Sequence, residues 1–207
     1  MSHGYIVDKV ARYYAARLSE HGATARGVDW NSAESHEIRH RQFLHLIDDT
    51  KSSVLDLGCG FGDFVRFLRQ SGHHGPFIGY DVAPSMIAEA KRIQHGCADT
   101  VWRVGARPSD TVDYAVASGI FNVKGDVPLD EWRCYVDETI EVLAQSGRRG
   151  FGFNVLSLSS DPDRRRPDLY YADPVEMLKY CMERFGRSVA LLQHYGLFEF
   201  TVIVRHA

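Results

Sequence analysis

Three closely spaced glycines follow a short apolar run in the first half of the chain. The segment Val54–Asp63 reads Val-Leu-Asp-Leu-Gly-Cys-Gly-Phe-Gly-Asp, an order that predicts a buried strand, a tight turn and the start of a helix. Glycines lack a Cβ, so the turn can reverse sharply and its backbone can approach a ligand. The first turn of a helix adds N–H groups without internal partners. Such a segment is typical of sites for nucleotide-like ligands.

Carboxylates around this turn narrow the class of ligand. Asp56 lies two residues before the first glycine, where its charge would repel a pyrophosphate and attract an ammonium group. Asp63 stands where a dinucleotide-binding fingerprint has its third glycine. Asp81 closes the next apolar run, 19 residues after Gly62, and there it could accept hydrogen bonds from ribose hydroxyls or simply cap a helix. The set predicts a ligand that joins an adenosine to an amino acid.

Short apolar runs alternate with amphipathic stretches over residues 51–207, which predicts βαβ units. The last two runs are separated by the short turn at Tyr195-Gly196, so we expect them to pair antiparallel. The predicted fold class is α/β, a Rossmann-like and mostly parallel sheet of seven strands with an antiparallel last strand and helices on both faces. The predicted strands are 53–57, 76–80, 100–104, 114–118, 150–156, 188–193 and 197–204.

The stretches VLDLGCGFGDF and IGYDVAPSMIAEAKR resemble the class I S-adenosylmethionine-dependent methyltransferase family, and the resemblance covers about residues 51–204. It implies S-adenosyl-L-methionine as the cofactor. Many members carry an acidic residue after the third strand that meets the adenine amino group; here backbone groups of Gly105 or Ala106 would do so. The other implied cofactor contacts are Asp56, Gly58, Cys59 and Gly60 at the methionine part, Asp81 at the ribose, and Val82 and Met86 at the adenine.

Residues 1–50 are polar, rich in predicted helix and carry five of the ten histidines. In the family, N-terminal additions of this type often cover the cofactor and shape the acceptor pocket. We therefore expect two regions, a helical lid that shapes the substrate site (1–50) and the cofactor-binding methyltransferase domain (51–207). Arg17 and Trp30 are the lid residues expected at the cofactor, Arg17 as a partner of its carboxylate. The alternative is that this region only packs on the sheet.

The loop after the fourth predicted strand should face the transferred methyl group, because ligands of open α/β sheets lie beyond the carboxyl ends of the strands. Ser118 is expected to contact the amino-acid part of the cofactor. Asn122 and Phe121 are expected to position the acceptor, although Asn122 also suits a simple turn. The candidates for a general base are His21, His36, His40 and His194, of which we select His21. The loop lacks the Asn/Asp-Pro-Pro-aromatic sequence of methyltransferases that act on nucleic-acid bases.

A pair of histidines and a run of arginines could each have a chemical role or a purely structural one. His36 and His40 have the i, i+4 spacing of metal ligands, but no third ligand is evident, so we predict no metal and expect a solvated helix face. Arg164, Arg165 and Arg166 follow the fifth predicted strand. They are suited to an acidic acceptor, while a solvated loop is the ordinary interpretation of such a charge run.

Composition limits the function classes. The formal net charge is −3, which argues against a general nucleic-acid binder. The four cysteines form no CxxC pair, the N-terminus has no apolar signal sequence and no run could span a bilayer, so we expect a cytoplasmic protein. Its oligomeric state, monomer or homodimer, stays open.

The predicted function is methyl transfer from S-adenosylmethionine to an oxygen or nitrogen of a small-molecule acceptor. A protein or RNA methyltransferase of the same fold is the alternative within this class. A nicotinamide-dependent oxidoreductase, or an inactive cofactor-binding subunit, is the alternative outside it.

Overall fold

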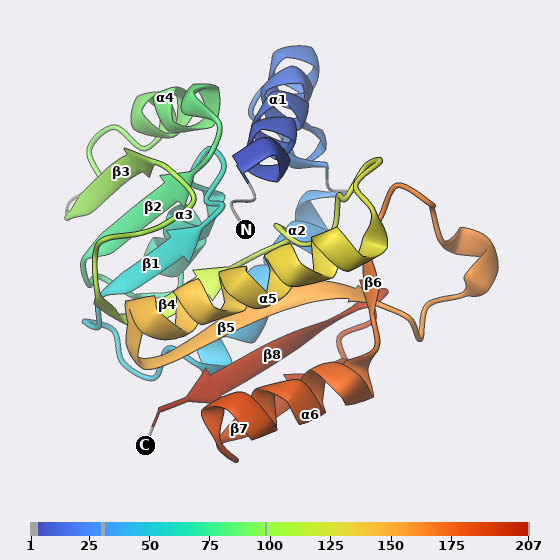
Figure 1. The fold of residues 1–207 in the computed structure, drawn as a ribbon. Helices are drawn as coiled ribbons and strands as arrows, with labels where there is room; N and C mark the ends of the chain where they lie inside the picture. The colour runs from blue at the N-terminus through green and yellow to red at the C-terminus, as the bar shows by residue number, and fades with distance from the viewer. Residues whose placement is uncertain (1–3, 30–31, 98, 207) are drawn as a thin grey trace.

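A computed structural model describes residues 4–29, 32–97 and 99–206 of the chain. Its sheet has the strand order β3-β2-β1-β4-β5-β8-β7, and a short strand, β6, pairs with the end of β5 (Figure 1). The strands are β1 Val54–Leu57, β2 Phe77–Asp81, β3 Thr100–Val104, β4 Val112–Ala117, β5 Gly147–Ser157, β6 Tyr171–Ala172, β7 Val189–Leu192 and β8 Glu199–Arg205.

The predicted mixed sheet is confirmed. The pairs between β3, β2, β1, β4 and β5 are parallel, and β8 runs antiparallel between β5 and β7. Sequence patterns missed β6 because it has only two residues, and they placed the start of β5 too late. Arg148 and Arg149 interrupt the apolar pattern there; they pair with Asp113 and with Asp48 and Asp49 at the amino end of the sheet.

Helices cover both faces of the sheet, as the alternation of β4 requires. Tyr114 and Val116 face a core built with α3, whereas Ala115 and Ala117 face a core built with α5 and α6. Among the helices of the described residues, none is both long and apolar enough to cross a lipid bilayer. The helices after the glycine turn are α3 Asp63–Gln70, α4 Pro84–Ile93, α5 Leu129–Ser146 and α6 Pro174–Phe185, with a 3₁₀ turn at Pro162–Arg164.

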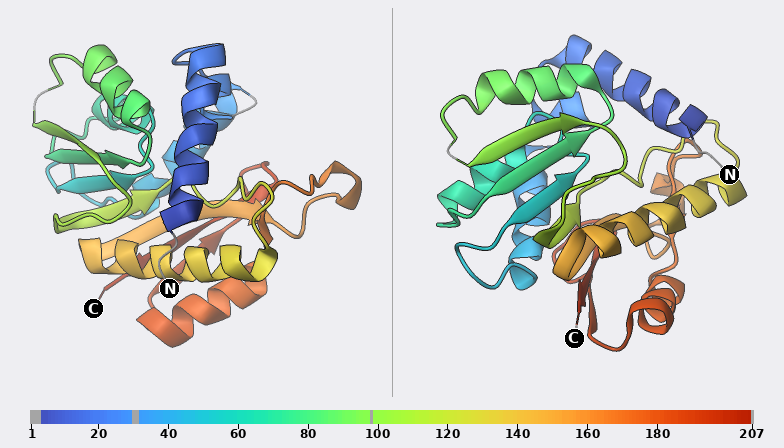
Figure 2. Two further views of the ribbon diagram at one scale, coloured as in Figure 1. Left: turned by 45° about the horizontal axis from the view of Figure 1, so that its top comes forward. Right: turned by 60° about the vertical axis from the view of Figure 1, so that its left-hand side comes forward.

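The N-terminal region divides into two parts with different surroundings. Helix α1 (Gly4–His21) and the 3₁₀ turn Ala25–Val28 lie beside α4 and above the sheet in the view of Figure 1, and Figure 2 shows α1 from two further sides. Helix α2 (Ala33–Gln42) leads into the 3₁₀ turn Phe43–His45, which packs with Leu46 into the core beneath α3. Residues 43–47 are therefore structural, while α1 is placed to cover a site.

This division can be tested with the same substitution at two nearby leucines. Leu46 is fully buried and Leu44 is 37% exposed. We expect Leu46→Ala to lower the free energy of unfolding by about 2–5 kcal/mol, because it leaves a cavity in the core. Leu44→Ala should cost less than about 1 kcal/mol. Urea unfolding followed by circular dichroism measures both, and equal costs would contradict the core position of Leu46.

Candidate active site

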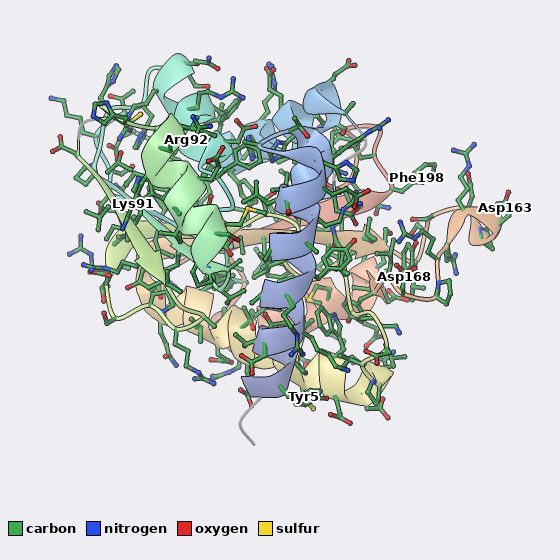
Figure 3. The ribbon with its side chains drawn as sticks, turned by 90° about the horizontal axis from the view of Figure 1, so that it is seen from above. Tyr5, Lys91, Arg92, Asp163, Asp168 and Phe198 are labelled. Atoms are coloured by element: carbon green, nitrogen blue, oxygen red, sulfur yellow. The ribbon has the colours of Figure 1, made fainter. Side chains whose placement is uncertain are left out.

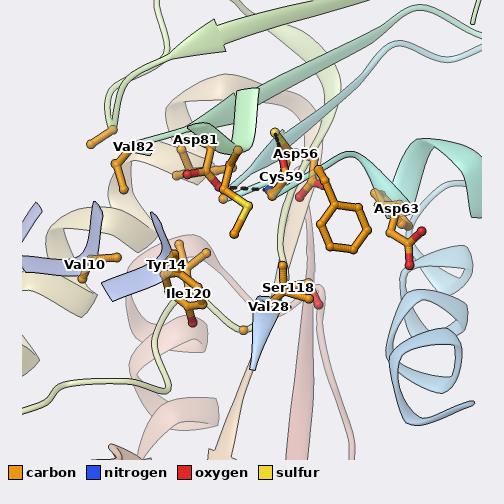
Figure 4. Close-up of a pocket in the computed structure, with 18 of the residues that line it drawn as sticks. Val10, Tyr14, Val28, Asp56, Cys59, Asp63, Asp81, Val82, Ser118 and Ile120 are labelled. Carbon is orange, nitrogen blue, oxygen red and sulfur yellow. Dashed lines mark hydrogen bonds between the residues drawn. The ribbon is translucent and has the colours of Figure 1, made fainter. Parts of the chain in front are cut away.

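A cavity opens at the carboxyl ends of β1, β2 and β4, between the glycine turn and α1. Figure 4 shows Asp56, Cys59 and Asp81 on its sheet side, with Val10 and Tyr14 of α1 facing them. We call it the first cavity. Its lining residues are Val10, Tyr14, Val28, His36, His40, Asp56, Leu57, Gly58, Cys59, Gly60, Phe61, Asp63, Phe64, Asp81, Val82, Met86, Gly105, Ala106, Ser118, Gly119, Ile120, Tyr135 and Thr139.

The glycine turn is held by the end of β2. The backbone N–H groups of Gly58 and Cys59 both donate to the Tyr80 carbonyl, at 2.7 and 2.9 Å. Gly58 has a φ of +80°, and a Cβ built there would lie 2.1 Å from Cγ2 of Ile120. Only glycine fits this position, because both the backbone conformation and the contact with Ile120 exclude a side chain. The turn thus presents bare backbone to the cavity.

Asp56 is a buried carboxylate that lacks a complete set of partners. It is 3% exposed, and within the described part of the chain its Oδ1 atom has no hydrogen-bond partner. Burial raises the pKa of Asp56 to about 8, and the neighbouring charge of Asp81 adds to the rise. A buried acceptor without a donor is costly. A cationic ligand group such as an ammonium would supply both the missing donors and the missing charge.

Asp81 is buried as well, but its oxygens have donors. Oδ2 accepts the N–H of Gly60 at 2.9 Å and Oδ1 accepts the N–H of Ala83 at 2.8 Å. Burial raises the pKa of Asp81 to about 6, although these backbone N–H groups oppose the rise. The N-cap of α4 is Ala83, so Asp81 is not the helix cap. Each carboxylate oxygen has a second lone pair, so ribose hydroxyls could still bind.

Asp63 occupies the position where a phosphate would bind in a dinucleotide site. It is the first residue of α3, and it pairs with Nδ1 of His36 at 3.0 Å and with Arg66. Burial would raise the pKa of Asp63, but the hydrogen bonds and charges of His36 and Arg66 lower it to about 2. This helix end already carries its own anion, which disfavours a second one. The site therefore fits an adenosyl amino acid better than a pyrophosphate.

The interpretation of His36 and His40 as a solvated helix face is wrong. Both are buried and line the first cavity. The His40 ring lies 5.0 Å from that of Phe64, and burial, followed by the charge of His36, holds the pKa of His40 well below its usual range. Among the described residues, no group of three or more His, Cys, Asp or Glu side chains could hold a metal ion.

The predicted adenine contacts lie together on one wall of the first cavity. Val82, Met86, Gly105 and Ala106 all line it, and the Gly105 N–H donates to the backbone carbonyl of Asp81 at 2.9 Å. Sequence reasoning missed two residues of α5 on this cavity, Tyr135 and Thr139. No local signal distinguishes them from the rest of an amphipathic helix.

Ser118 lines the first cavity as expected, and a residue that the sequence did not single out positions it. Asn154 is fully buried in β5; its Nδ2 donates to Ser118 Oγ at 3.2 Å, and its Oδ1 accepts the Gly119 N–H at 2.7 Å. A polar residue inside an otherwise apolar strand was the available signal, because buried polar groups need partners.

A second cavity adjoins the first and shares Tyr14, Val28 and Gly119 with it. Segments that are far apart in the sequence form its wall, from α1 to the loop before β8. Its lining residues are Tyr14, Val28, Asp29, Ser35, Arg39, Gly119, Asn122, Val123, Leu156, Ser160, Arg164, Arg166, Leu169, Tyr171, Leu197 and Phe198.

The remaining candidate residues are distributed differently from the prediction. Asn122 lines the second cavity, and its Oδ1 accepts the Leu156 N–H at 3.2 Å. Among the described residues around the two cavities, His21 and Arg17 line neither one; Arg17 pairs with Asp29 at 3.1 Å. Phe121 is fully buried in the core. Trp30 lies outside the described residues.

Sequence comparisons relate this chain to methyltransferases. The family described as "Methyltransferase domain" matches residues 55–148. Rv1506c of Mycobacterium tuberculosis (strain ATCC 25618 / H37Rv), a protein assigned as a methyltransferase, is 43% identical over 155 residues, which make up 75% of this chain and 93% of that protein.

Solved structures show the same fold at low sequence identity. The protein in the DhpI-SAH complex is 21% identical to this chain with a TM-score of 0.67. The alignment covers 100% of this chain and 99% of that protein's chain. Magnesium protoporphyrin IX methyltransferase (ChlM) from Synechocystis PCC 6803 with bound SAH is 14% identical with a TM-score of 0.66, with both chains covered in full (100%). The small RNA methyltransferase HEN1 is 12% identical with a TM-score of 0.61, and covers 84% of this chain and 25% of its own.

The relative from M. tuberculosis, the match to the methyltransferase domain and the fold agree with the two carboxylates and the glycine turn of the first cavity. The chain belongs to the S-adenosylmethionine-dependent methyltransferase family.

Proposed function

We propose that this methyltransferase transfers the methyl group to an oxygen or nitrogen of a small molecule that binds in the second cavity. The observation that carries the proposal is the shared wall of the two cavities, formed by Tyr14, Val28 and Gly119. A group held in the second cavity would contact the cofactor where the two cavities adjoin, beside these residues. Bringing two reactants into contact in the right orientation is a major contribution to catalysis at a site of this type.

The first cavity is proposed to hold S-adenosylmethionine through contacts that follow from its geometry. Asp56, with its unpartnered oxygen, would bind the ammonium group, and Asp81 would bind the ribose hydroxyls. Ser118, held by Asn154, would face the amino-acid part. When bound, the cofactor supplies a methyl group activated by a sulfonium. The protein's own part is to align the acceptor and to exclude water, the latter through α1 and Val28.

An RNA or protein acceptor is the alternative, and an RNA methyltransferase is among the proteins that share the fold. Surface charge supports the small molecule. Binding of RNA depends on a local excess of positive charge, but a carboxylate lies at 2.5–2.7 Å from each of the exposed arginines Arg66, Arg92 and Arg184 and offsets its charge. The net charge of −3 agrees with this.

The role of Asp56 predicts a loss of cofactor affinity. Asp56→Asn removes the anion that would pair with the ammonium group, so we expect S-adenosylhomocysteine to bind about tenfold or more weakly. Isothermal titration measures the affinity. The matched control is Asp130→Asn, since the Asp130 side chain is 96% exposed at the start of α5. Unchanged affinity in Asp56→Asn would remove Asp56 from the cofactor site.

Asp56 also predicts how stability depends on pH. An unfolded aspartate ionises near pH 3.8, and folding raises the pKa of Asp56 to about 8. Between these values the folded protein keeps a proton that the unfolded chain has lost. The free energy of unfolding of the cofactor-free protein therefore falls as the pH rises towards 8, by up to about 1.4 kcal/mol per pH unit from this group.

Asp56→Asn removes that contribution, so the stability difference between variant and wild type should shift in favour of the variant from pH 5 to pH 8. Denaturant unfolding at several pH values, without cofactor, measures the shift. A constant difference across this range would show that Asp56 is already ionised in the folded protein.

The site and the class of the acceptor can be tested with a bulky residue in the second cavity. Leu169→Trp should block methyl transfer while cofactor affinity stays within about twofold, because Leu169 lines only the second cavity. Val175→Trp, at a position 71% exposed on α6, is the control. Transfer of an isotope-labelled methyl group is followed in separated small-molecule, RNA and protein fractions of a cell extract. Label in the RNA or protein fraction alone would overturn the small-molecule acceptor.

A further inference from the structure

The second cavity has a positively charged wall. Arg39 of α2 and Arg164 and Arg166 of the loop after β5 line it, against Asp29 as the one carboxylate among its described lining residues. Asp29 itself is already engaged, because its oxygens contact the Tyr13 hydroxyl at 2.9 Å and Arg17 at 3.1 Å. The carboxylates that accompany the three arginines, Glu199, Asp161 and Asp168, are not among the described residues that line the cavity.

The loop after β5 directs two of its three arginines to the cavity. The middle one, Arg165, donates from Nη2 to the carbonyls of Leu158 and Ser160, at 2.6 and 2.8 Å, and so ties the loop to the end of β5. Its neighbours Arg164 and Arg166 line the cavity. The run Arg164–Arg166 is thus not a uniformly solvated loop, because its members have different partners.

Arg164 and Arg166 both keep donor capacity. The ion pair from Arg164 Nε to Asp161 measures 3.6 Å, which is longer than a hydrogen bond, and its guanidinium lies 5.4 Å from the Phe198 ring centre. Arg166 uses Nε and Nη2 for Asp168, two of the five N–H groups that a guanidinium carries. Figure 3 shows Asp163, Asp168 and Phe198 on the same side of the molecule.

The guanidinium group of Arg39 is held in place by two hydrogen bonds. Its Nε donates to the fully buried Glu199 at 2.7 Å and its Nη1 donates to the Ser35 carbonyl at 2.9 Å. Guanidinium groups held in this way are suited to carboxylate and phosphonate oxygens, which they can bind in pairs.

Apolar side chains form much of the remaining wall, together with the polar residues Ser35, Asn122, Ser160 and Tyr171. Its apolar members are Val28, Val123, Leu156, Leu169, Leu197 and Phe198, and Phe198 is 47% exposed at the surface. A ligand that matches both parts has an anionic group and a hydrocarbon or aromatic body.

We propose that the acceptor is a small organic acid, held by Arg39, Arg164 and Arg166, and that the methyl group goes to an oxygen of its carboxylate or phosphonate. This inference rests on the proposed function of the second cavity. One oxygen–carbon bond forms while the methyl–sulfur bond breaks, and the electron pair of that bond stays on sulfur. The sulfonium loses its positive charge, the acid loses one negative charge, and no proton has to leave.

Methylation of an anion needs no general base, and this agrees with the residues that line the second cavity. Among its described lining residues there is no histidine, lysine or glutamate, and Asp29 is held by Tyr13 and Arg17. Burial, followed by the charge of Asp29, raises the pKa of Tyr14 far above its ordinary value, so this phenol stays protonated. An acceptor that arrives as an anion needs none of them as a base.

Binding to the protein saturated with S-adenosylhomocysteine tests the proposal. The probes are phenylacetate and phenylphosphonate, with phenylacetamide and benzyl alcohol as their neutral counterparts. We expect the acids to bind at least about tenfold more tightly than the neutral probes. Arg164→Gln and Arg166→Gln should each weaken the acids about tenfold, while Arg92→Gln, on α4 at the opposite side in Figure 3, should not.

The outcomes separate this proposal from the one on which it rests. If S-adenosylhomocysteine does not bind the wild-type protein, the proposed function fails as well. If it binds, but the acids bind no better than the neutral probes or not at all, only the acidic acceptor is overturned. Wild-type affinity for the acids in both arginine variants would also overturn it. Mass spectrometry after incubation with S-adenosylmethionine should show methyl esters of the acids and no methyl ether of benzyl alcohol.

Discussion

Two buried carboxylates at the ends of neighbouring parallel strands are the constraint on which the site depends. Asp81 gains the N–H groups of Gly60 and Ala83, so its position and the conformation of the glycine turn stabilise each other. Asp56, one strand away, keeps an oxygen to which no described residue donates a hydrogen bond. The first cavity therefore contains a buried acceptor that a cationic ligand can satisfy. Without ligand, this unsatisfied acceptor destabilises the folded protein.

The N-terminal region connects this constraint to the rest of the molecule. Phe43, Leu46 and Ile47 belong to the core beneath α3, and Ile6 of α1 belongs to the core on the other face of the sheet. Between these anchors, Tyr14 and Val28 lie over both cavities. The N-terminal region is thus attached at two points to a folded core, and it lines both cavities through the same side chains.

Methyltransferases of this fold act on different acceptors, because the fold positions the cofactor while the acceptor wall comes from surrounding segments. In this chain the wall combines arginines from α2 and from the loop after β5 with apolar residues before β8. Their charge is local. The chain as a whole is weakly acidic, and many of its surface arginines are paired with carboxylates.

The sequence by itself determined the class of protein, the order and type of the seven main strands, and the turn at Val54–Asp63 with Asp81. These depend on short-range patterns, the two-residue period of strands and the spacing of glycines and acids, which are visible in one stretch of chain. Only the tertiary structure decided that His36 and His40 are buried, that Asn154 holds Ser118, that Asn122 and three arginines share a second cavity, and that His21 and Arg17 lie off both cavities. Each of these depends on which distant segments pack together, and burial and partners that arise from long-range packing leave no periodic trace in the local sequence.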